Sequence, residues 1–116
     1  MAIPNYQSYM IRTRRATAAA CLLEIAQSME RFYTVNLSYK KDKAKKDFVL
    51  KSSQCQTDLT GYYTFSATPD TRTYTLSAVP QSAQKDKDPA KCGTLTLDQT
   101  GKKGAGTGAD VSTCWK

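Results

Sequence analysis

The chain has 116 residues, with 17 lysines and arginines against 10 aspartates and glutamates (net charge +7), four cysteines and no histidine. A domain of this size buries about two-thirds of its unfolded surface, and 40% hydrophobic residues are enough for one modest core. Without histidine, catalysis by a Ser–His or Cys–His pair and histidine-containing zinc sites are excluded. We therefore predict one non-enzymatic domain, over residues 1–116, with no catalytic site, metal, cofactor or small-molecule substrate.

The first predicted element is a long amphipathic helix over about residues 5–35, a stretch without glycine or proline. Its apolar side chains recur at steps of three and four residues, at Ala18, Leu22, Ile25, Met29 and Phe32, with Ala26 and Tyr33 beside them. A helix of about 30 residues would be about 45 Å long, which exceeds the diameter of so small a domain. Because the apolar stripe is weak over residues 5–15, we expect that half to project from the domain.

The second segment, residues 36–60, breaks the helical pattern and predicts an irregular connecting loop. Six lysines lie between residues 40 and 51, interleaved with Asp42 and Asp47. The only apolar residues in that stretch besides an alanine are Phe48, Val49 and Leu50. We expect Phe48 and Leu50 to pack the loop against the core and Cys55 to fasten it to the helix.

Residues 61–99 contain three runs of alternating apolar and polar residues, which predict strands. Their inward positions are Tyr63, Phe65 and Ala67 in the first, Tyr74, Leu76 and Ala78 in the second, and Leu95 and Leu97 in the third. The turn signal at residues 68–71 joins the first two strands as a hairpin. We predict loops for the polar stretch 81–90 and for the glycine-rich stretch 101–108. The order of elements predicts an α+β fold, with the helix packed on a three- to four-stranded antiparallel sheet.

The four cysteines are widely separated in the sequence and include no close pair of the kind that binds zinc. Two disulfides in an exported protein are the favoured interpretation, and buried reduced thiols in a cytosolic protein are the alternative. Three pairings are open for four cysteines. We favour Cys21–Cys55 with Cys92–Cys114, since each pair then closes a local loop.

Several segments, taken together, resemble one known protein family. Residues 2–9 are similar to the stretch that follows the hydrophobic segment in type IV pilins, and residues 26–33 are similar to the second half of the helix in minor pilins of the PilE type. Residues 74–80 and 92–101 resemble the last two strands, and residues 110–115 resemble the closing cysteine segment. The resemblance implies a type IV pilin-like fold whose C-terminal loop, over 92–114, is closed by Cys92–Cys114. The pair Cys21 and Cys55 departs from the simplest family pattern.

The resemblance also implies a role and a location. It implies a leader and about 20 apolar residues upstream of Ala2, enough to anchor the subunit in the inner membrane of a Gram-negative bacterium before it enters a surface pilus. The implied role is that of a structural minor pilin, which contributes to pilus assembly initiation and so to twitching motility, adhesion and DNA uptake. Its partners would be other major and minor pilins, contacted through Tyr6, Tyr9, Met10, Arg12 and Arg14.

A DNA-uptake receptor is the alternative function, because clustered cations are what phosphate contacts require. The candidate residues for contact with DNA or a partner are Lys40, Lys41, Lys43, Lys45, Lys46, Lys102 and Lys103. The interleaved Asp42 and Asp47 favour instead a solvated loop that maintains solubility. A third alternative is a pseudopilin of a type II secretion system. Pseudopilins more often carry calcium-binding carboxylates than disulfides, and this chain has no acidic cluster near its C-terminus.

Overall fold

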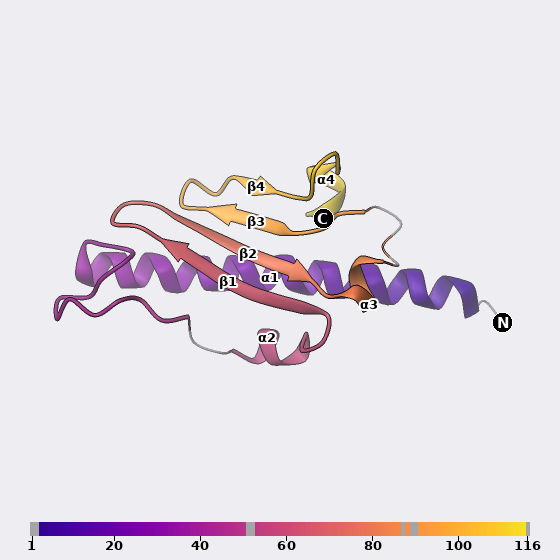
Figure 1. Cartoon of the computed structure of the whole chain (residues 1–116), viewed down its shortest axis with the longest axis horizontal. Coiled ribbons are helices and arrows are strands. Elements are labelled where there is room, and N and C mark those ends of the chain that lie inside the picture. The colour runs from indigo at the N-terminus through magenta and orange to yellow at the C-terminus, as the bar shows by residue number, and fades with distance from the viewer. Residues whose placement is uncertain (1–2, 51–52, 87, 89–90, 116) are drawn as a thin grey trace.

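One long helix runs along one face of a four-stranded antiparallel sheet (Figure 1). The computed structural model describes residues 3–50, 53–86, 88 and 91–115, with the backbone alone for residues 3–5. The helices and strands, in chain order, are α1 (Ile3–Asn36), α2 (Gln54–Asp58), β1 (Tyr63–Pro69), β2 (Tyr74–Pro80), α3 (Ser82–Lys85), β3 (Leu95–Asp98), β4 (Lys103–Gly104) and α4 (Val111–Cys114). The predicted α+β fold, of a long helix on a three- to four-stranded sheet, is confirmed.

The core lies between α1 and the sheet. The helix contributes its apolar stripe, with Leu22 and Met29 fully buried, and Phe32 half-buried at its end. The register of the sheet places Leu76 opposite Leu97 and Ala78 opposite Leu95, so their side chains share the face that packs on the helix. The inward positions predicted for the three strands are therefore confirmed, with Phe65 and Ala67 only half-buried near the edge.

Three stretches predicted as loops contain regular structure. Ser82–Lys85 form the single helical turn α3, and Gln84 within it is fully buried, although the stretch is polar. In the glycine-rich stretch, Lys103 and Gly104 pair with β3 as the short strand β4. A Cβ on Gly104 would collide with the side chain of Thr96, so only glycine allows this close pairing. The connecting loop also contains α2, at Gln54–Asp58.

The N-terminal half of α1 projects less far than predicted. Ile11 and Arg15 are buried, with 2% and 6% of their surfaces exposed. The side chain of Gln84 reaches α1, where its Nε2 donates to the carbonyl oxygen of Ile11 at 2.8 Å. The domain therefore covers α1 from Ile11 onward, whereas Tyr6 and Tyr9 remain 62% and 57% exposed.

The end of α1 carries a leucine in a conformation that favours glycine. The amide of Leu37 donates to the carbonyl oxygen of Tyr33 at 2.7 Å, and its φ of 56° lies in the left-handed region. That region costs a residue with a Cβ roughly 1–2 kcal/mol, part of which glycine would lose again through its larger unfolded-state entropy. We expect Leu37→Gly to raise the free energy of unfolding by about 0.5–1 kcal/mol, measured by urea denaturation. Leu37→Ala, which retains the strain, should give no gain; equal stabilities of the two variants would contradict this account.

Candidate functional site

Three connections lie on the side of the molecule where α1 ends (Figure 1): the αβ-loop (described over residues 37–50), the β1–β2 turn (residues 70–73) and the β3–β4 turn (residues 99–102). The amide of Tyr39 donates to the carbonyl oxygen of Thr71 at 3.0 Å, which joins the αβ-loop to the β1–β2 turn. The amide of Tyr74 donates to Oε1 of Gln99 at 3.2 Å, which joins the start of β2 to the β3–β4 turn. We call this end of the molecule the loop end.

The loop end collects most of the lysines that the sequence singled out. Its exposed cations are Lys40, Lys41, Lys43, Lys45, Lys46, Arg72 and Lys102. Arg72 was missed, because an isolated arginine in a turn gives no signal in the sequence. The remaining candidate, Lys103, begins β4, and its Nζ lies 5.5 Å from the centroid of the Trp115 ring, in a cation–π contact.

The carboxylates of the loop end are engaged in local structure. Oδ1 of Asp42 accepts from the amides of Ala44 and Lys46 at 2.8 and 2.9 Å. Oδ1 of Asp98 accepts from Thr100, and these hydrogen bonds lower the pKa of the carboxyl below its usual value. Each of these acids therefore shapes a loop while it offsets part of the positive charge.

Lys41 forms an ion pair within the αβ-loop. Nζ of Lys41 lies 2.6 Å from Oδ1 of Asp47, and this hydrogen bond lowers the pKa of Asp47. Within the residues that the structure describes, none of the other six cations of the loop end has a carboxylate within 4.0 Å. Seven cations against Asp42, Asp47, Asp70 and Asp98 leave an excess of positive charge at this end.

A buried tyrosine anchors the αβ-loop behind these lysines. The hydroxyl of Tyr39 donates to the carboxylate of Glu30, at 2.9 Å from each oxygen, and its ring packs against Tyr74 with centroids 4.8 Å apart. Tyr74 also reaches Glu30, at 3.4 Å. The predicted packing of Phe48 and Leu50 is also seen, since both are half-buried against the core and Phe48 meets Phe32 edge to face at 5.2 Å.

Two buried tyrosines, Tyr39 and Tyr63, are expected to make the fold less stable at alkaline pH. Burial, followed by the hydrogen bond to Glu30, raises the pKa of Tyr39 from 10.0 to about 12, and burial raises that of Tyr63 to about 12 as well. A raised folded-state pKa means that the fold favours the protonated phenol. We expect full stability below pH 10 and a progressive loss as the pH rises through 12, measured by urea denaturation with tyrosinate absorbance as a second readout. Tyr39→Phe and Tyr63→Phe should each flatten this decline; an unchanged slope in both would refute the assignment.

A cleft of about 650 Å³ separates the αβ-loop from the C-terminal half of α1. Its apolar lining comes from both sides, with Ile25, Phe32 and Val35 from the helix and Val49 and Leu50 from the loop. Arg31 and Lys46 lie at the same cleft, with Glu24, Asp42 and Asp47. Charges of both signs therefore line the cleft.

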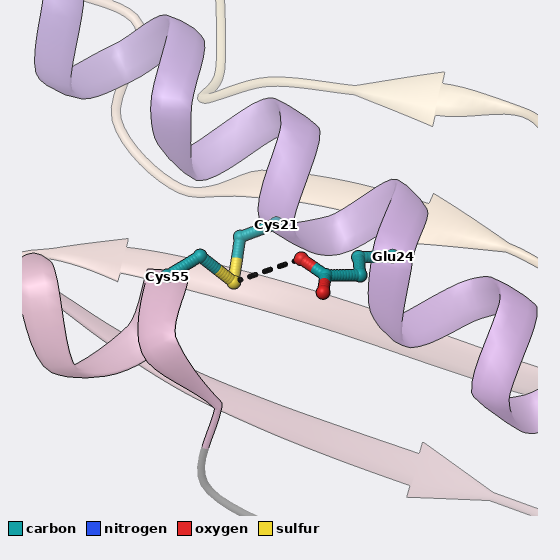
Figure 2. Close-up of side chains that lie close together, drawn as sticks. All are labelled: Cys21, Glu24 and Cys55. Carbon is teal, nitrogen blue, oxygen red and sulfur yellow. Dashed lines mark hydrogen bonds between the residues drawn. A yellow bond between two sulfur atoms is a disulfide. The ribbon is translucent and has the colours of Figure 1, made fainter.

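One group of side chains has the composition of a metal site but not its chemistry (Figure 2). The sulfur atoms of Cys21 and Cys55 are joined to each other, so neither can be a thiolate ligand. Oε2 of Glu24 lies 3.3 Å from Sγ of Cys55, which carries no proton to donate in the disulfide. The second bridge joins Cys92 to Cys114, so the structure contains both disulfides in the pairing favoured from the sequence.

A buried polar cluster at the opposite end of the domain was not predicted. Nη1 of Arg15 lies 2.7 Å from Oδ1 of Asp88, and Oδ2 of Asp88 accepts from the amide of Cys92 at 3.2 Å. Nε2 of Gln84 lies 3.4 Å from the hydroxyl of Tyr63 beside them. One signal in the sequence could have indicated the burial of Arg15: it lies four residues after Ile11, on the same face of the helix as the apolar stripe.

The residues predicted to contact other pilins lie near the N-terminal end of α1. Tyr6, Tyr9 and Arg12 are exposed, and Met10 is half-buried. Arg14 is also half-buried, because its guanidinium lies over the Tyr62 ring of the same chain, 3.8 Å from the centroid. Among the described residues, no helix combines the length and the apolar character needed to cross a membrane.

Comparisons with known proteins agree with the fold. A type IV pilin of Shewanella oneidensis is 32% identical, over 87% of this chain and 96% of that one, with a TM-score of 0.60. The non-core minor pilin PilV of Neisseria meningitidis is 29% identical, over 90% and 95% of the two chains, with a TM-score of 0.62. No curated protein matches the chain. The family described as "Type IV minor pilin ComP, DNA uptake sequence receptor" matches residues 4–96, and the chain therefore belongs to this family of type IV minor pilins.

Proposed function

We propose that this minor pilin binds duplex DNA through the loop end and serves as a DNA receptor on the pilus. The observation that carries the proposal is the family match, over residues 4–96, to a family described as a DNA uptake sequence receptor. The sequence alone favoured a structural subunit, because the lysines are interleaved with acids. Asp42 and Asp47 still offset part of this charge, but seven exposed cations at the loop end outnumber its aspartates, and Arg72 adds to the lysines that the sequence singled out.

The arrangement of charges supports this proposal. Lys40, Arg72 and Lys102 come from three different loops, and those loops lie side by side at one end of the molecule (Figure 1). A protein that neutralises phosphates with lysine and arginine gains affinity from the release of counterions. The first turn of α1 lies at the far end of the helix from the loop end (Figure 1). If the N-terminal part of α1 packs among other pilins, the loop end stays available to DNA.

Removing two cations from different loops tests this function. We expect Lys40→Gln with Lys102→Gln to lower the slope of log K against log[salt] by about 2, since each lost phosphate contact lowers it by about 1. The loss should be the same for all DNA sequences, because phosphate contacts carry no sequence information. The measurement is fluorescence anisotropy of labelled duplexes across a salt series.

The matched control is Lys85→Gln, which removes an exposed lysine of α3, away from the loop end (Figure 1). It should leave the slope unchanged. If the parent protein shows no binding at low salt, or if Lys85→Gln and the double variant behave alike, the loop end is not a DNA site.

A structural role in pilus assembly is the second candidate. The observation that favours it is the exposure of Tyr6 and Tyr9 on the uncovered end of α1, beside the exposed Arg12. In this role the chain would contact other pilins, help to initiate the fibre and so affect twitching motility and adhesion, with an inner-membrane anchor before assembly. Deletion of the gene, with surface piliation, twitching and DNA uptake scored separately, distinguishes the two. Loss of uptake with normal piliation supports the receptor, and loss of piliation supports the assembly role.

A further inference from the structure

The most exposed large apolar side chain at the loop end is Leu37. It is 73% exposed, and the Leu37 backbone, directly after the last residue of α1, has the left-handed conformation. Two energetic costs coincide at this position, since both the exposure of an apolar side chain and the positive φ are unfavourable. Asparagine or glycine would remove both, so folding alone does not account for a leucine here.

Hydrogen bonds tie the two residues that flank Leu37 to the lysine-rich loop. The amides of Lys40 and Lys41 donate to Oγ of Ser38 at 3.1 and 3.2 Å. The amide of Lys43 donates to Oδ1 of Asn36 at 3.1 Å, which folds the lysine-rich loop back beside Leu37. Helix α1 precedes the residue, and the buried Tyr39 follows it by two positions. The exposed Leu37 side chain therefore stands next to a loop whose backbone is tied to the residues on either side of it, and that loop carries exposed lysines.

We propose that Leu37 is a wedge that inserts between neighbouring base pairs of DNA bound at the loop end. This inference rests on the proposed function and specifies how the DNA is held. Proteins that bend DNA insert apolar side chains at base steps, while nearby cations hold the phosphates on either side. The exposed lysines of the adjacent loop make duplex DNA a better match than an apolar protein surface, because a protein partner would have to supply carboxylates for them.

Leu37 lies outside the cleft between α1 and the αβ-loop, unlike the other strongly exposed apolar residues of the region. Val35 and Val49 both line the cleft between α1 and the αβ-loop, whereas Leu37 does not. A side chain that stands apart from the cleft can enter a stack of bases without the loop moving. Insertion is least costly at pyrimidine–purine steps such as TA, which unstack most readily.

The test uses duplexes with 2-aminopurine at a central TA step and with donor and acceptor dyes at the two ends. The parent protein should raise the 2-aminopurine fluorescence and shorten the end-to-end distance. Leu37→Asn should abolish both effects and weaken binding about tenfold, the loss expected when one buried leucine is removed, with the salt slope unchanged. Leu37→Met, which keeps an apolar side chain, should retain both effects.

Two comparisons separate the wedge from trivial explanations. Asparagine tolerates the left-handed conformation, so Leu37→Asn should be at least as stable as the parent, and lost stability cannot account for lost distortion. Leu23→Gln removes another exposed leucine, from the middle of α1, and should change neither readout.

Each other outcome overturns the wedge. If Leu37→Asn distorts DNA as the parent does, while the double variant at Lys40 and Lys102 still loses binding, the wedge is wrong and the DNA function stands. If the parent shows no salt-dependent binding to duplex DNA, both proposals fail. If Leu37→Asn weakens cross-linking between pilins and leaves DNA distortion unchanged, Leu37 serves a protein contact instead.

Discussion

Replacing Cys92 and Cys114 together by alanine is expected to lower the free energy of unfolding by about 3 kcal/mol. The two residues are 22 positions apart, and closing a loop of that length removes about this much chain entropy from the unfolded state. Both side chains are buried, at 0% and 1% exposure, so the bridge also occupies the core. Against a total stability of about 5–15 kcal/mol for a small domain, the loss is large.

The loop closed by this disulfide contains β3, β4 and α4, the elements that position the β3–β4 turn at the loop end. Urea denaturation of the oxidised parent and of the double variant measures the change. The matched comparison is Cys21→Ala with Cys55→Ala, whose separation of 34 predicts a loss only slightly larger, since closure entropy grows slowly with loop length. A double variant at Cys92 and Cys114 as stable as the parent would show that the fold does not depend on this bridge.

Asp88→Ala is expected to destabilise the domain by about 3–5 kcal/mol, because it leaves the buried guanidinium of Arg15 without its partner. The side chains of Arg15 and Asp88 are 7% and 4% exposed, so water does not replace the lost carboxylate. The amide of Cys92 loses its acceptor in the same substitution. The free energy of unfolding from urea denaturation measures the effect.

Arg15→Met with Asp88→Ala provides the control for that prediction. The double variant removes the buried charge along with its partner, and an apolar replacement for a buried ion pair is often nearly neutral. We therefore expect it to recover most of the stability lost by Asp88→Ala. Losses that simply add in the double variant would mean that the two side chains do not stabilise each other.

How far the sequence predicts this protein depends on how local each feature is. The apolar stripe of α1 and the alternation in β1, β2 and β3 repeat within a few residues, so their buried faces could be read directly. The burial of Gln84 and Asp88 could not be read from the sequence, because it depends on distant partners. Gln84 bonds to Ile11 and Asp88 to Arg15, and each pair is separated by 73 positions. A polar stretch that closes over a helix has the same composition as a solvated loop.

The same distinction applies to the candidate site. Composition alone shows the lysines of residues 40–46 and of the glycine-rich stretch, and the pattern of Asp42 and Asp47 between them suggests a neutralised loop. The backbone hydrogen bond between Tyr39 and Thr71 brings Arg72 to the same end of the molecule as these lysines. No local sequence pattern predicts such a hydrogen bond between distant loops.

The sequence by itself determined the α+β fold, the inward faces of helix and strands, the favoured cysteine pairing and the resemblance to minor pilins. These follow from periodicity, spacing and short motifs, which need no knowledge of distant contacts. The tertiary structure decided which loops share one end, which acids are engaged, and that Leu37 stands exposed and strained beside the lysine-rich loop. Charge and exposure at a surface depend on which segments meet there, and only the folded chain brings those segments together.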